Sequence, residues 1–213
     1  PPPLTPIHDR GLAGQSQTVT VCDTGLDLNH EAFSHPGLPF TYGVLNPGHR
    51  KVYLYYKVTE GGVDYGDYVA GSHGTHVSGT VGGDAPLTPG GTDWGSYNKW
   101  DGMEFAGKLV VCDLFLFANQ HPSDYDNIYR PGYDIAGSRI FTNSWAFWYS
   151  WDGEPQGKYT TRSRMVDEFM WAHSDALVIF VAHNDGPAPM TIRQESAAKD
   201  IITVGASQNA DDP

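Results

Sequence analysis

The chain has 213 residues, 39% of them hydrophobic and 13% aromatic, which is enough to bury one sizeable core. Its 25 acidic residues outnumber its 13 Lys and Arg residues and give a net charge of −12, so the phosphate backbone of a nucleic acid would be repelled and no nucleic-acid partner is expected. The longest apolar run, "ALVIFVA" at residues 176–182, has the length of a strand and is far short of the roughly 20 residues of a membrane span, so no membrane partner is expected either.

Composition and the first residues bear on where the protein works. An acidic chain that is rich in Gly and aromatic residues and low in Lys is typical of secreted proteins, and the sequence begins with "PPPLTP" rather than with Met, which indicates processing or trimming. We therefore expect a secreted, extracellular protein. Cys22 and Cys112 each end an apolar run, "VTVC" and "KLVVC", and this position favours two buried free thiols over a disulfide bridge.

Six short apolar runs, separated by turns, predict the strands of one sheet, and they are residues 18–22, 51–58, 108–114, 138–142, 177–182 and 201–204. Near-continuous apolar strands are buried on both faces, which is typical of a parallel sheet. Residues 161–173 carry apolar side chains at helical spacing, whereas residues 85–102 are rich in turn formers and predict a surface loop. The sequence therefore favours a single α/β domain.

The first predicted strand runs directly into Asp23 and a Thr-Gly turn, in the stretch "TVTVCDTGLD". This places a carboxylate at the carboxyl end of a parallel strand, where open α/β sheets build their functional sites. A catalytic role is one interpretation. The other is that Asp23 caps the turn, as Asp often does after a strand, and this motif alone does not decide between them.

Two histidines, His73 and His76, lie in the glycine-rich stretch "GSHGTHVSGTVGGD". If His73 is in the first turn of a helix, the small residues allow that helix to pack closely against the strand that carries Asp23. The carboxylate would then fix one nitrogen of the His73 ring and leave the other free to act as a general base. A zinc site is the alternative. The chain has neither an HExxH sequence nor a Cys pair nearby, which favours a base at His73 and a buried packing role for His76.

The fifth predicted strand is followed by "HNDGPA", in which Asn184 stands between His183 and Asp185. A side-chain amide fixed at the end of a strand can donate a hydrogen bond to a developing oxyanion, although "NDG" is also an ordinary turn sequence. The order along the chain is informative, because Asp23, His73 and Asn184 each follow a strand of one predicted sheet.

Five segments carry a family resemblance: "VCDTGLD", "SHGTHVSGTVGG", "NSWA", "VAHNDGP" and "IITVGAS". In this order, and over almost the whole chain, they resemble the subtilases, the subtilisin-like serine peptidases. The resemblance implies an α/β, three-layer subtilisin-like fold with a mainly parallel central sheet and helices on both faces. It also implies a serine endopeptidase that hydrolyses peptide bonds with an Asp-His-Ser triad and requires no cofactor for this chemistry.

On this resemblance Asp23 would be the triad Asp, His73 the triad base and Asn184 the oxyanion donor. Within the family, the segments "DTGLDLNHEAF", "TNSWA" and "YTTRSRMVDEF" are most similar to the alkaline, oxidation-resistant branch that carries an added C-terminal β-barrel.

The resemblance also implies where a protein or peptide substrate would bind. Ser144 and Trp145 would lie on the strand that pairs with the substrate backbone. The pocket for the residue before the scissile bond would be edged by Ala182, His183 and Asp185. His183 stands where the family usually has Gly, so either the backbone differs there or the pocket floor is partly filled, and Asp185 adds a negative charge to the rim.

The family's nucleophile lies in a "GTSMA"-like helix start, and no serine of this sequence has that context. We therefore interpret residues 1–213 as the N-terminal part of one catalytic domain, with the catalytic Ser on a C-terminal partner chain from the same precursor. A catalytically dead subtilase fold that binds peptides is the alternative. A small-molecule-binding α/β module would predict a GxGxxG loop after the first strand, and "CDTGLD" lacks it.

A structural calcium ion is common in the family, but the carboxylate expected shortly after the triad Asp is Ala32 here, so that particular site is expected to be missing. The Asp-rich stretch "GGVDYGDY" could hold calcium, although a solvated loop is the favoured interpretation. The sequence assigns no metal ligand.

Overall fold

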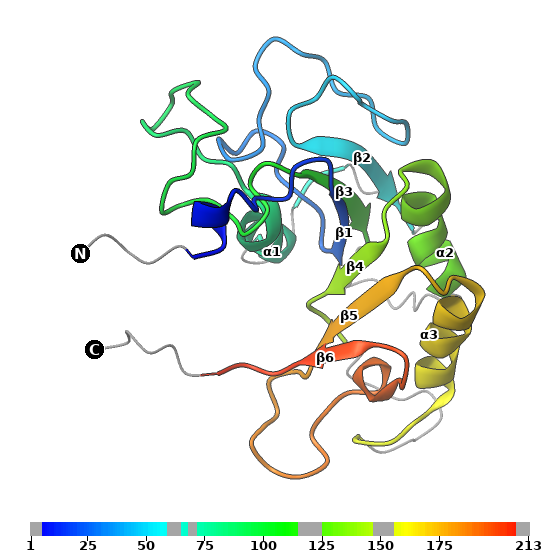
Figure 1. Cartoon of the computed structure of the whole chain (residues 1–213). Helices are drawn as coiled ribbons and strands as arrows, with labels where there is room; N and C mark the ends of the chain where they lie inside the picture. The colour runs from blue at the N-terminus through cyan, green and yellow to red at the C-terminus, as the bar shows by residue number, and fades with distance from the viewer. Residues whose placement is uncertain (1–5, 59–64, 68–71, 115–124, 147–155, 208–213) are drawn as a thin grey trace.

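The computed structural model describes residues 6–58, 65–67, 72–114, 125–146 and 156–207. They form a six-stranded sheet in the order β2-β3-β1-β4-β5-β6, in which every described pair of neighbours is parallel (Figure 1). The strands are β1 (Thr18–Asp23), β2 (Val52–Lys57), β3 (Lys108–Asp113), β4 (Ile140–Asn143), β5 (Leu177–Val181) and β6 (Ile202–Val204). The helices are α1 (His73–Gly82), α2 (Tyr125–Arg130) and α3 (Thr161–Ala172), with short turns η1 (His8–Arg10), η2 (Pro131–Ile135) and η3 (Glu195–Ala197).

The predicted strands and the predicted helix over residues 161–173 are confirmed, with ends that differ by about two residues, the usual uncertainty of an element boundary. The neighbouring inner strands β1 and β3 are buried from their second residue onward, which explains their unbroken apolar sequences. Cys22 and Cys112 are partners in the β1–β3 register, and both are buried free thiols as predicted. Residues 85–102 hold no regular structure, which also agrees with the sequence.

Helices cover both faces of the sheet, so the predicted α/β architecture is confirmed. Figure 1 shows α1 on one face, and α2 and α3 together on the other. The larger core lies between the sheet and α2 and α3, where Phe141, Phe169 and Phe180 are almost fully buried. The smaller core lies under α1 and includes Val21 and Leu109. No described helix is long and apolar enough to cross a membrane.

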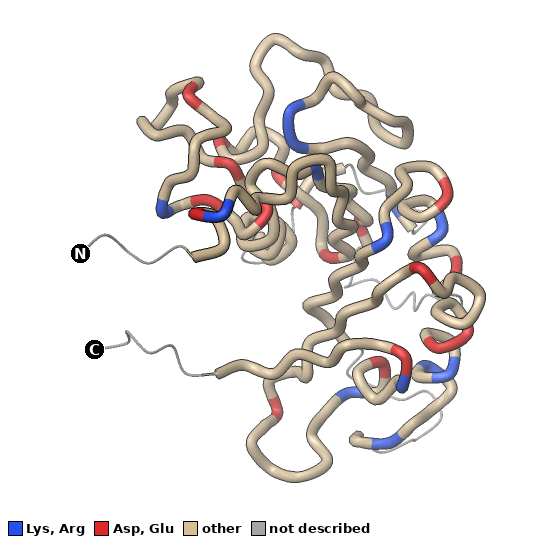
Figure 2. Tube along the Cα trace, in the orientation of Figure 1, with Lys and Arg blue, Asp and Glu red and all other residues tan. Residues whose placement is uncertain are grey.

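The α1 face of the sheet is covered unevenly. Residues Ile202 and Val204 of β6 are 49% and 50% exposed, and alternate residues of β5 on the same face are only half-buried. Figure 1 shows no described helix beside β4, β5 and β6 on this side, and Figure 2 shows no charged residue on these three strands. This part of the sheet, which we call the open apolar face, is therefore a surface of mainly aliphatic side chains.

Helix α1 approaches the sheet closely because it is rich in glycine. A Cβ atom on Gly74 would lie 2.2 Å from the carbonyl oxygen of Gly25, which is too close for any other residue. Gly25 itself has a φ of +112°, a conformation that residues with a side chain rarely adopt. The glycines of both motifs therefore bring the start of α1 against the turn that follows β1.

Candidate active site

Asp23 and His73 meet at the carboxyl edge of the sheet. Asp23 is the last residue of β1 and is 1% exposed, while His73 is the first residue of α1. The Nδ1 atom of His73 lies 2.6 Å from Asp23 Oδ1, a short hydrogen bond in which the carboxylate accepts. The contact predicted from the two motifs is therefore present.

The first turn of α1 is held by partners from other segments rather than by its own cap residue. Ser72 precedes the helix in a left-handed conformation and makes no side-chain cap bond. Instead the Gly74 N–H donates to Thr24 Oγ1 at 2.8 Å, and the Thr75 N–H donates to Asp67 Oδ2 at 2.8 Å. The Thr24 hydroxyl donates in turn to Asp67 Oδ1 at 2.8 Å. Two N–H groups that a helix start leaves unsatisfied are thus bound, which fixes His73 relative to β1.

The electrostatics of the pair suit a general base. The hydrogen bond that His73 donates to Asp23 raises the pKa of His73 above its ordinary value, and this outweighs partial burial, which lowers it. The same carboxylate oxygen, Oδ1, accepts the Thr24 N–H at 2.8 Å, so two donors hold this oxygen. The His73 side chain is 49% exposed, whereas that of Asp23 is 1% exposed. The Nε2 atom of His73 has no protein partner among the described residues and is available for proton transfer.

A second carboxylate, whose role was not predicted from the sequence, lies next to the pair. Asp113 ends β3 in register with Asp23 and accepts the hydroxyl of Tyr55 at 3.1 Å. Burial, followed by the Asp113 charge, raises the pKa of Tyr55, whose hydroxyl also accepts the Leu26 N–H at 2.9 Å and the Gly66 N–H at 3.1 Å. Tyr55 therefore fixes the turn after Asp23. The signal was present, because "VVCDL" repeats the apolar run followed by Asp that marks Asp23.

The predicted oxyanion residue lies on the same edge of the sheet. Asn184 follows β5, and β4 alone separates β5 from β1, so about 10 Å of sheet width lies between the two strand ends. Its side chain is exposed and makes no hydrogen bond within the described parts of the chain. The placement agrees with the prediction, although no described contact tests the role.

His183 stands where the family usually has Gly, and the structure shows which backbone conformation it adopts there. His183 has a φ of +81°, so the chain keeps a left-handed turn that favours Gly although the residue carries a ring. The expected negative charge on the pocket rim needs a correction, because Asp185 Oδ2 lies 2.5 Å from Nη2 of Arg193, a residue that is 3% exposed. The charge of Asp185 is therefore compensated by an ion pair.

The other predicted substrate residues follow β4 and β5. Ser144 is half-buried directly after β4, and the Ala182 N–H donates to Val204 O at 2.7 Å, which continues the β5–β6 pairing. Trp145 is 5% exposed, and its ring lies edge-on to Phe180 with centroids 5.3 Å apart. The Trp145 side chain is therefore part of the core, so only its backbone can pair with a substrate.

His76 does not have the predicted packing role. It is exposed on the outer face of α1, in a helix whose buried residues are Gly74, Ser78 and Gly82. The prediction was wrong because a helix of small residues has no apolar stripe from which its buried face can be deduced. Within the described ranges, no group of three or more His, Cys, Asp or Glu residues could hold a metal ion. Most of "GGVDYGDY" lies outside the described residues, so the calcium expectation is not tested there.

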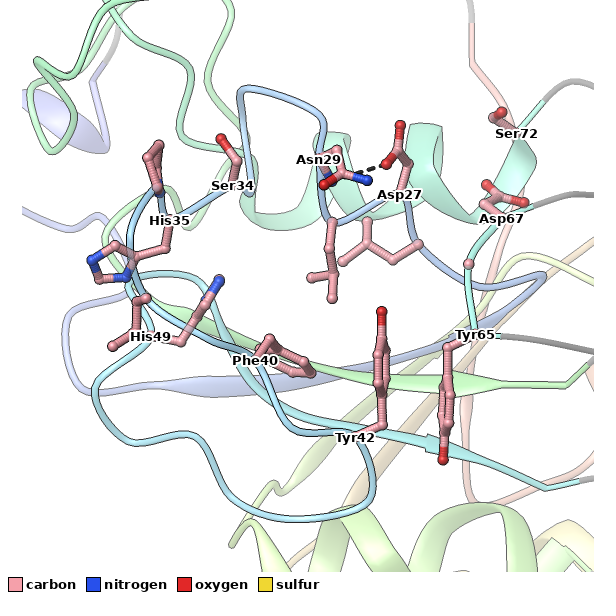
Figure 3. Close-up of a pocket in the computed structure, with 15 residues that line it drawn as sticks. Asp27, Asn29, Ser34, His35, Phe40, Tyr42, His49, Tyr65, Asp67 and Ser72 are labelled. Carbon is pink, nitrogen blue, oxygen red and sulfur yellow. Dashed lines mark hydrogen bonds between the residues drawn. The ribbon is translucent and has the colours of Figure 1, made fainter.

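A cavity of about 700 Å³ borders the start of α1 and was not predicted (Figure 3). Ser72 and Asp67 line it on the side of the active site. The rings of Tyr42 and Tyr65 form part of its wall and are stacked with centroids 4.0 Å apart. Figure 3 shows Phe40 and the two tyrosines on the side opposite Asp27. The cavity therefore combines an aromatic wall with carboxylates.

A buried carboxylate bound to a half-exposed imidazole, at the carboxyl edge of a parallel sheet, is an arrangement that hydrolases with a histidine general base use. The sequence profile of the Subtilase family matches residues 14–213. The chain belongs to the subtilase family, and the family supports a serine peptidase.

Curated relatives come from Dictyostelium discoideum. The serine protease/ABC transporter B family protein tagD is 33% identical over 207 residues, and tagB of the same description is 33% identical over 204 residues. These alignments cover 94% and 95% of this chain but only 10% of each relative. The chain thus spans about a tenth of the length of these relatives. The finer resemblance to the branch with a C-terminal β-barrel stays a prediction.

Solved structures support the fold. The subtilisin-like protease Apa1 from the Antarctic psychrotroph Pseudoalteromonas sp. AS-11 gives a TM-score of 0.55 at 15% identity, covering 88% of this chain and 35% of that one. The CspB protease of Clostridium perfringens gives 0.53 at 17% identity, covering 84% of this chain and 38% of that one. At these identities the likeness concerns the fold alone.

Proposed function

We propose that this chain is the Asp- and His-bearing part of a serine endopeptidase, and that a serine outside these 213 residues completes the triad. The observation that carries the proposal is the 2.6 Å hydrogen bond from His73 Nδ1 to Asp23, which leaves the other ring nitrogen unpartnered within the described residues. An imidazole fixed in this way accepts a proton at Nε2 and delivers it in the next step.

The reaction divides into an acylation and a deacylation. His73 Nε2 takes the proton of the serine hydroxyl as its oxygen attacks the scissile carbonyl, and Asp23 stabilises the imidazolium that forms. Asn184 donates its amide N–H to the oxyanion of the tetrahedral species. His73 then gives the proton to the leaving amine, which frees the new amino terminus. Water deprotonated by His73 hydrolyses the acyl-enzyme and restores the serine.

The placement of the nucleophile rests on two features of the structure. No serine hydroxyl among the described residues hydrogen-bonds to His73, and Ser78, which is also on α1, is fully buried. The open apolar face of β4, β5 and β6 lies beside α1 (Figure 1). A helix packed there would bury Ile202 and Val204 and bring its first turn toward the carboxyl edge of the sheet. We propose that this helix carries the serine on a second chain of the same precursor, held by that contact.

Further expectations belong to the same proposal. The substrate would be a protein or peptide whose backbone pairs with the segment at Ser144 and Trp145 and whose side chain before the scissile bond meets residues 182–185. Extracellular location is supported by the composition, and a structural calcium ion by the family. A dead subtilase fold that only binds peptides is the alternative, and it would hold if the completing segment lacked the serine.

The test uses the protein as assembled in its natural precursor. A serine-directed fluorophosphonate should label a residue outside positions 1–213. The unlabelled protein should hydrolyse peptides, and labelling should stop this hydrolysis. His73→Ala should abolish both, because the serine is unreactive without its base, whereas His76→Ala on the exposed face of α1 should leave both unchanged. Label on any serine of this chain, including Ser144, would contradict the proposal. Peptide binding without label or hydrolysis would establish the alternative.

The two-chain arrangement has its own readout. Native purification of this chain should bring a C-terminal fragment with it, and the two should separate only in denaturant. A single covalent polypeptide in the mature protein would contradict the second chain but would not contradict the triad assignment.

A further inference from the structure

Asn184 is the residue that the proposed function assigns to the oxyanion, yet no described group holds its amide. The side chain is exposed and makes no hydrogen bond within the described ranges. An oxyanion donor is effective only when its position is fixed before the reaction. Within the described residues, the position of Asn184 is therefore set by the residues on either side of it.

Both neighbours of Asn184 contact one guanidinium group, that of Arg193. Arg193 Nε–H donates to His183 Nδ1 at 3.3 Å, and Arg193 Nη2 lies 2.5 Å from Asp185 Oδ2. His183 Nδ1 and Asp185 Oδ2 are themselves 3.3 Å apart. A guanidinium is a planar, permanently charged fork, so it can hold an imidazole and a carboxylate in a defined relation. We call this group the Arg193 clamp.

The backbone inside the clamp is strained. The φ of +81° at His183 is unfavourable for a residue with a Cβ atom and persists only where the surroundings hold it. The His183 side chain is only 10% exposed. A buried ring bound by Arg193 provides that restraint, and it defines the direction in which the chain enters Asn184.

Arg193 is itself anchored to the core. Its side chain is 4% exposed. The carbonyl oxygen of the next residue, Gln194, accepts the hydroxyl of Ser163 in the first turn of α3 at 2.5 Å. Ser196 Oγ donates at 2.6 Å to the carbonyl oxygen of Val181, the last residue of β5. The clamp therefore connects the segment of Asn184 to α3 and to the end of its own strand.

We propose that Arg193 is a positioning residue for the oxyanion donor: it binds His183 and Asp185 together and so fixes the backbone from which the Asn184 amide projects. This inference rests on the proposed peptidase function. The role is indirect, since Arg193 reaches Asn184 only through its neighbours. A side chain at position 183, where the family usually has Gly, supplies one of the two contacts.

The kinetic test compares Arg193→Met with Arg139→Met in the complete, active protein. Arg139 forms an Arg–Asp pair of similar length, 2.7 Å from its Nε to Asp175 Oδ2. This pair lies at the amino ends of β4 and β5, away from Asn184. Arg193→Met should lower kcat about tenfold or more, part of the loss expected for the oxyanion donor itself, with little change in KM. Arg139→Met should leave both constants near the parent values.

A double variant separates positioning from a purely structural role. In the Asn184→Ala background the donor is already absent, so Arg193→Met should reduce kcat by less than about twofold further. If the two reductions in kcat multiply, Arg193 does not act through Asn184 and the proposal is overturned.

A second measurement does not depend on activity. Hydrogen exchange of the Ala182 amide, which donates to Val204 O at 2.7 Å where this segment leaves β5, should accelerate in Arg193→Met, while β1 exchanges as in the parent. Unchanged exchange at Ala182 would overturn the clamp. If the parent hydrolyses no peptide, the proposed function fails, and the exchange result still decides whether the clamp exists. Should Arg193→Met fail to fold, Arg193→Lys keeps the charge and the buried stem but cannot bind both partners as a fork, and it should also accelerate exchange.

Discussion

Asp23 and Asp113 end neighbouring parallel strands in exact register with each other, yet only Asp23 binds His73. Asp23 Oδ1 lies 2.6 Å from the imidazole, while Asp113 Oδ2 accepts the hydroxyl of Tyr55 at 3.1 Å. The same strand motif thus produces one carboxylate that orients the base and one that supports the adjoining turn. This pair provides a matched comparison for mutagenesis.

We expect Asp23→Asn to lower the pKa of His73, because the Asp23 hydrogen bond is the main cause of its rise. Turnover of the complete protein should fall by about 10⁴, the loss seen when an Asn replaces the Asp of a serine peptidase triad. Titration of the His73 ring by NMR and a rate assay measure the two effects. Asp113→Asn should affect mainly stability, by about 1 to 3 kcal/mol. Equal effects of the two substitutions on the pKa of His73 would contradict the assignment.

Asn184→Ala distinguishes an oxyanion donor from a turn residue. As the donor, Asn184 should account for about 10² to 10³ in kcat with KM nearly unchanged, because the donor engages only the tetrahedral species. As a turn residue it should cost about 1 kcal/mol of stability and little rate. The control is Asn46→Ala, in an exposed turn where the amide donates to Thr41 O and Val44 O. If both variants lose only stability, backbone groups alone stabilise the oxyanion.

Glu104 makes stability depend on pH. Burial raises the pKa of its carboxyl to about 8 from 4.5, against the opposing charge of Lys51, and both its oxygens are buried without a hydrogen bond in the described chain. A raised folded-state pKa contributes stability that is complete below 4.5 and is lost as the pH rises toward 8.

Glu104→Gln should therefore gain stability relative to the parent as the pH rises from 5 to 8, by up to about 1.4 kcal/mol per pH unit, as measured by urea unfolding. Glu168→Gln, on the exposed surface of α3, should follow the parent. A Glu104→Gln curve parallel to the parent's would show that the carboxyl titrates normally.

The left-handed backbone of His183 predicts an order of stabilities. His183→Gly should be more stable than His183→Ala by about 1 kcal/mol, because both lose the contact with Arg193 but only Gly relieves the strain. Ser16 is an exposed control with a φ of +64°, and its Gly and Ala variants should differ in the same direction. Equal free energies of unfolding for the two His183 variants would mean that the segment does not hold a left-handed conformation.

The strands and the Asp23–His73 pair could be predicted because their signals are local. Apolar runs of strand length identify buried parallel strands, and a carboxylate at such a strand end points to the edge where sites form. Glycines at Gly25 and Gly74 then allow a close contact that the sequence alone makes plausible. The family motifs assigned roles to the same residues.

What could not be predicted depends on contacts between distant segments. The bonds of Asp67 to Thr24 and Thr75, and those of Arg193 to His183 and Asp185, leave no periodic trace in the sequence. Helix α2 was missed because its six residues are too few to show a helical period and are followed by Pro131 and Gly132.

The central claim is that His73 acts as the general base for a serine supplied from outside this chain. A peptidyl chloromethyl ketone tests it directly, since the serine oxygen adds reversibly to the ketone and the neighbouring base then displaces chloride to form a stable bond. Mass-spectrometric mapping of the complete protein should find the reagent on the His73 ring, with Asp23→Asn slowing the reaction. An adduct on His76, or none on His73 in a protein that hydrolyses peptides, would contradict the account.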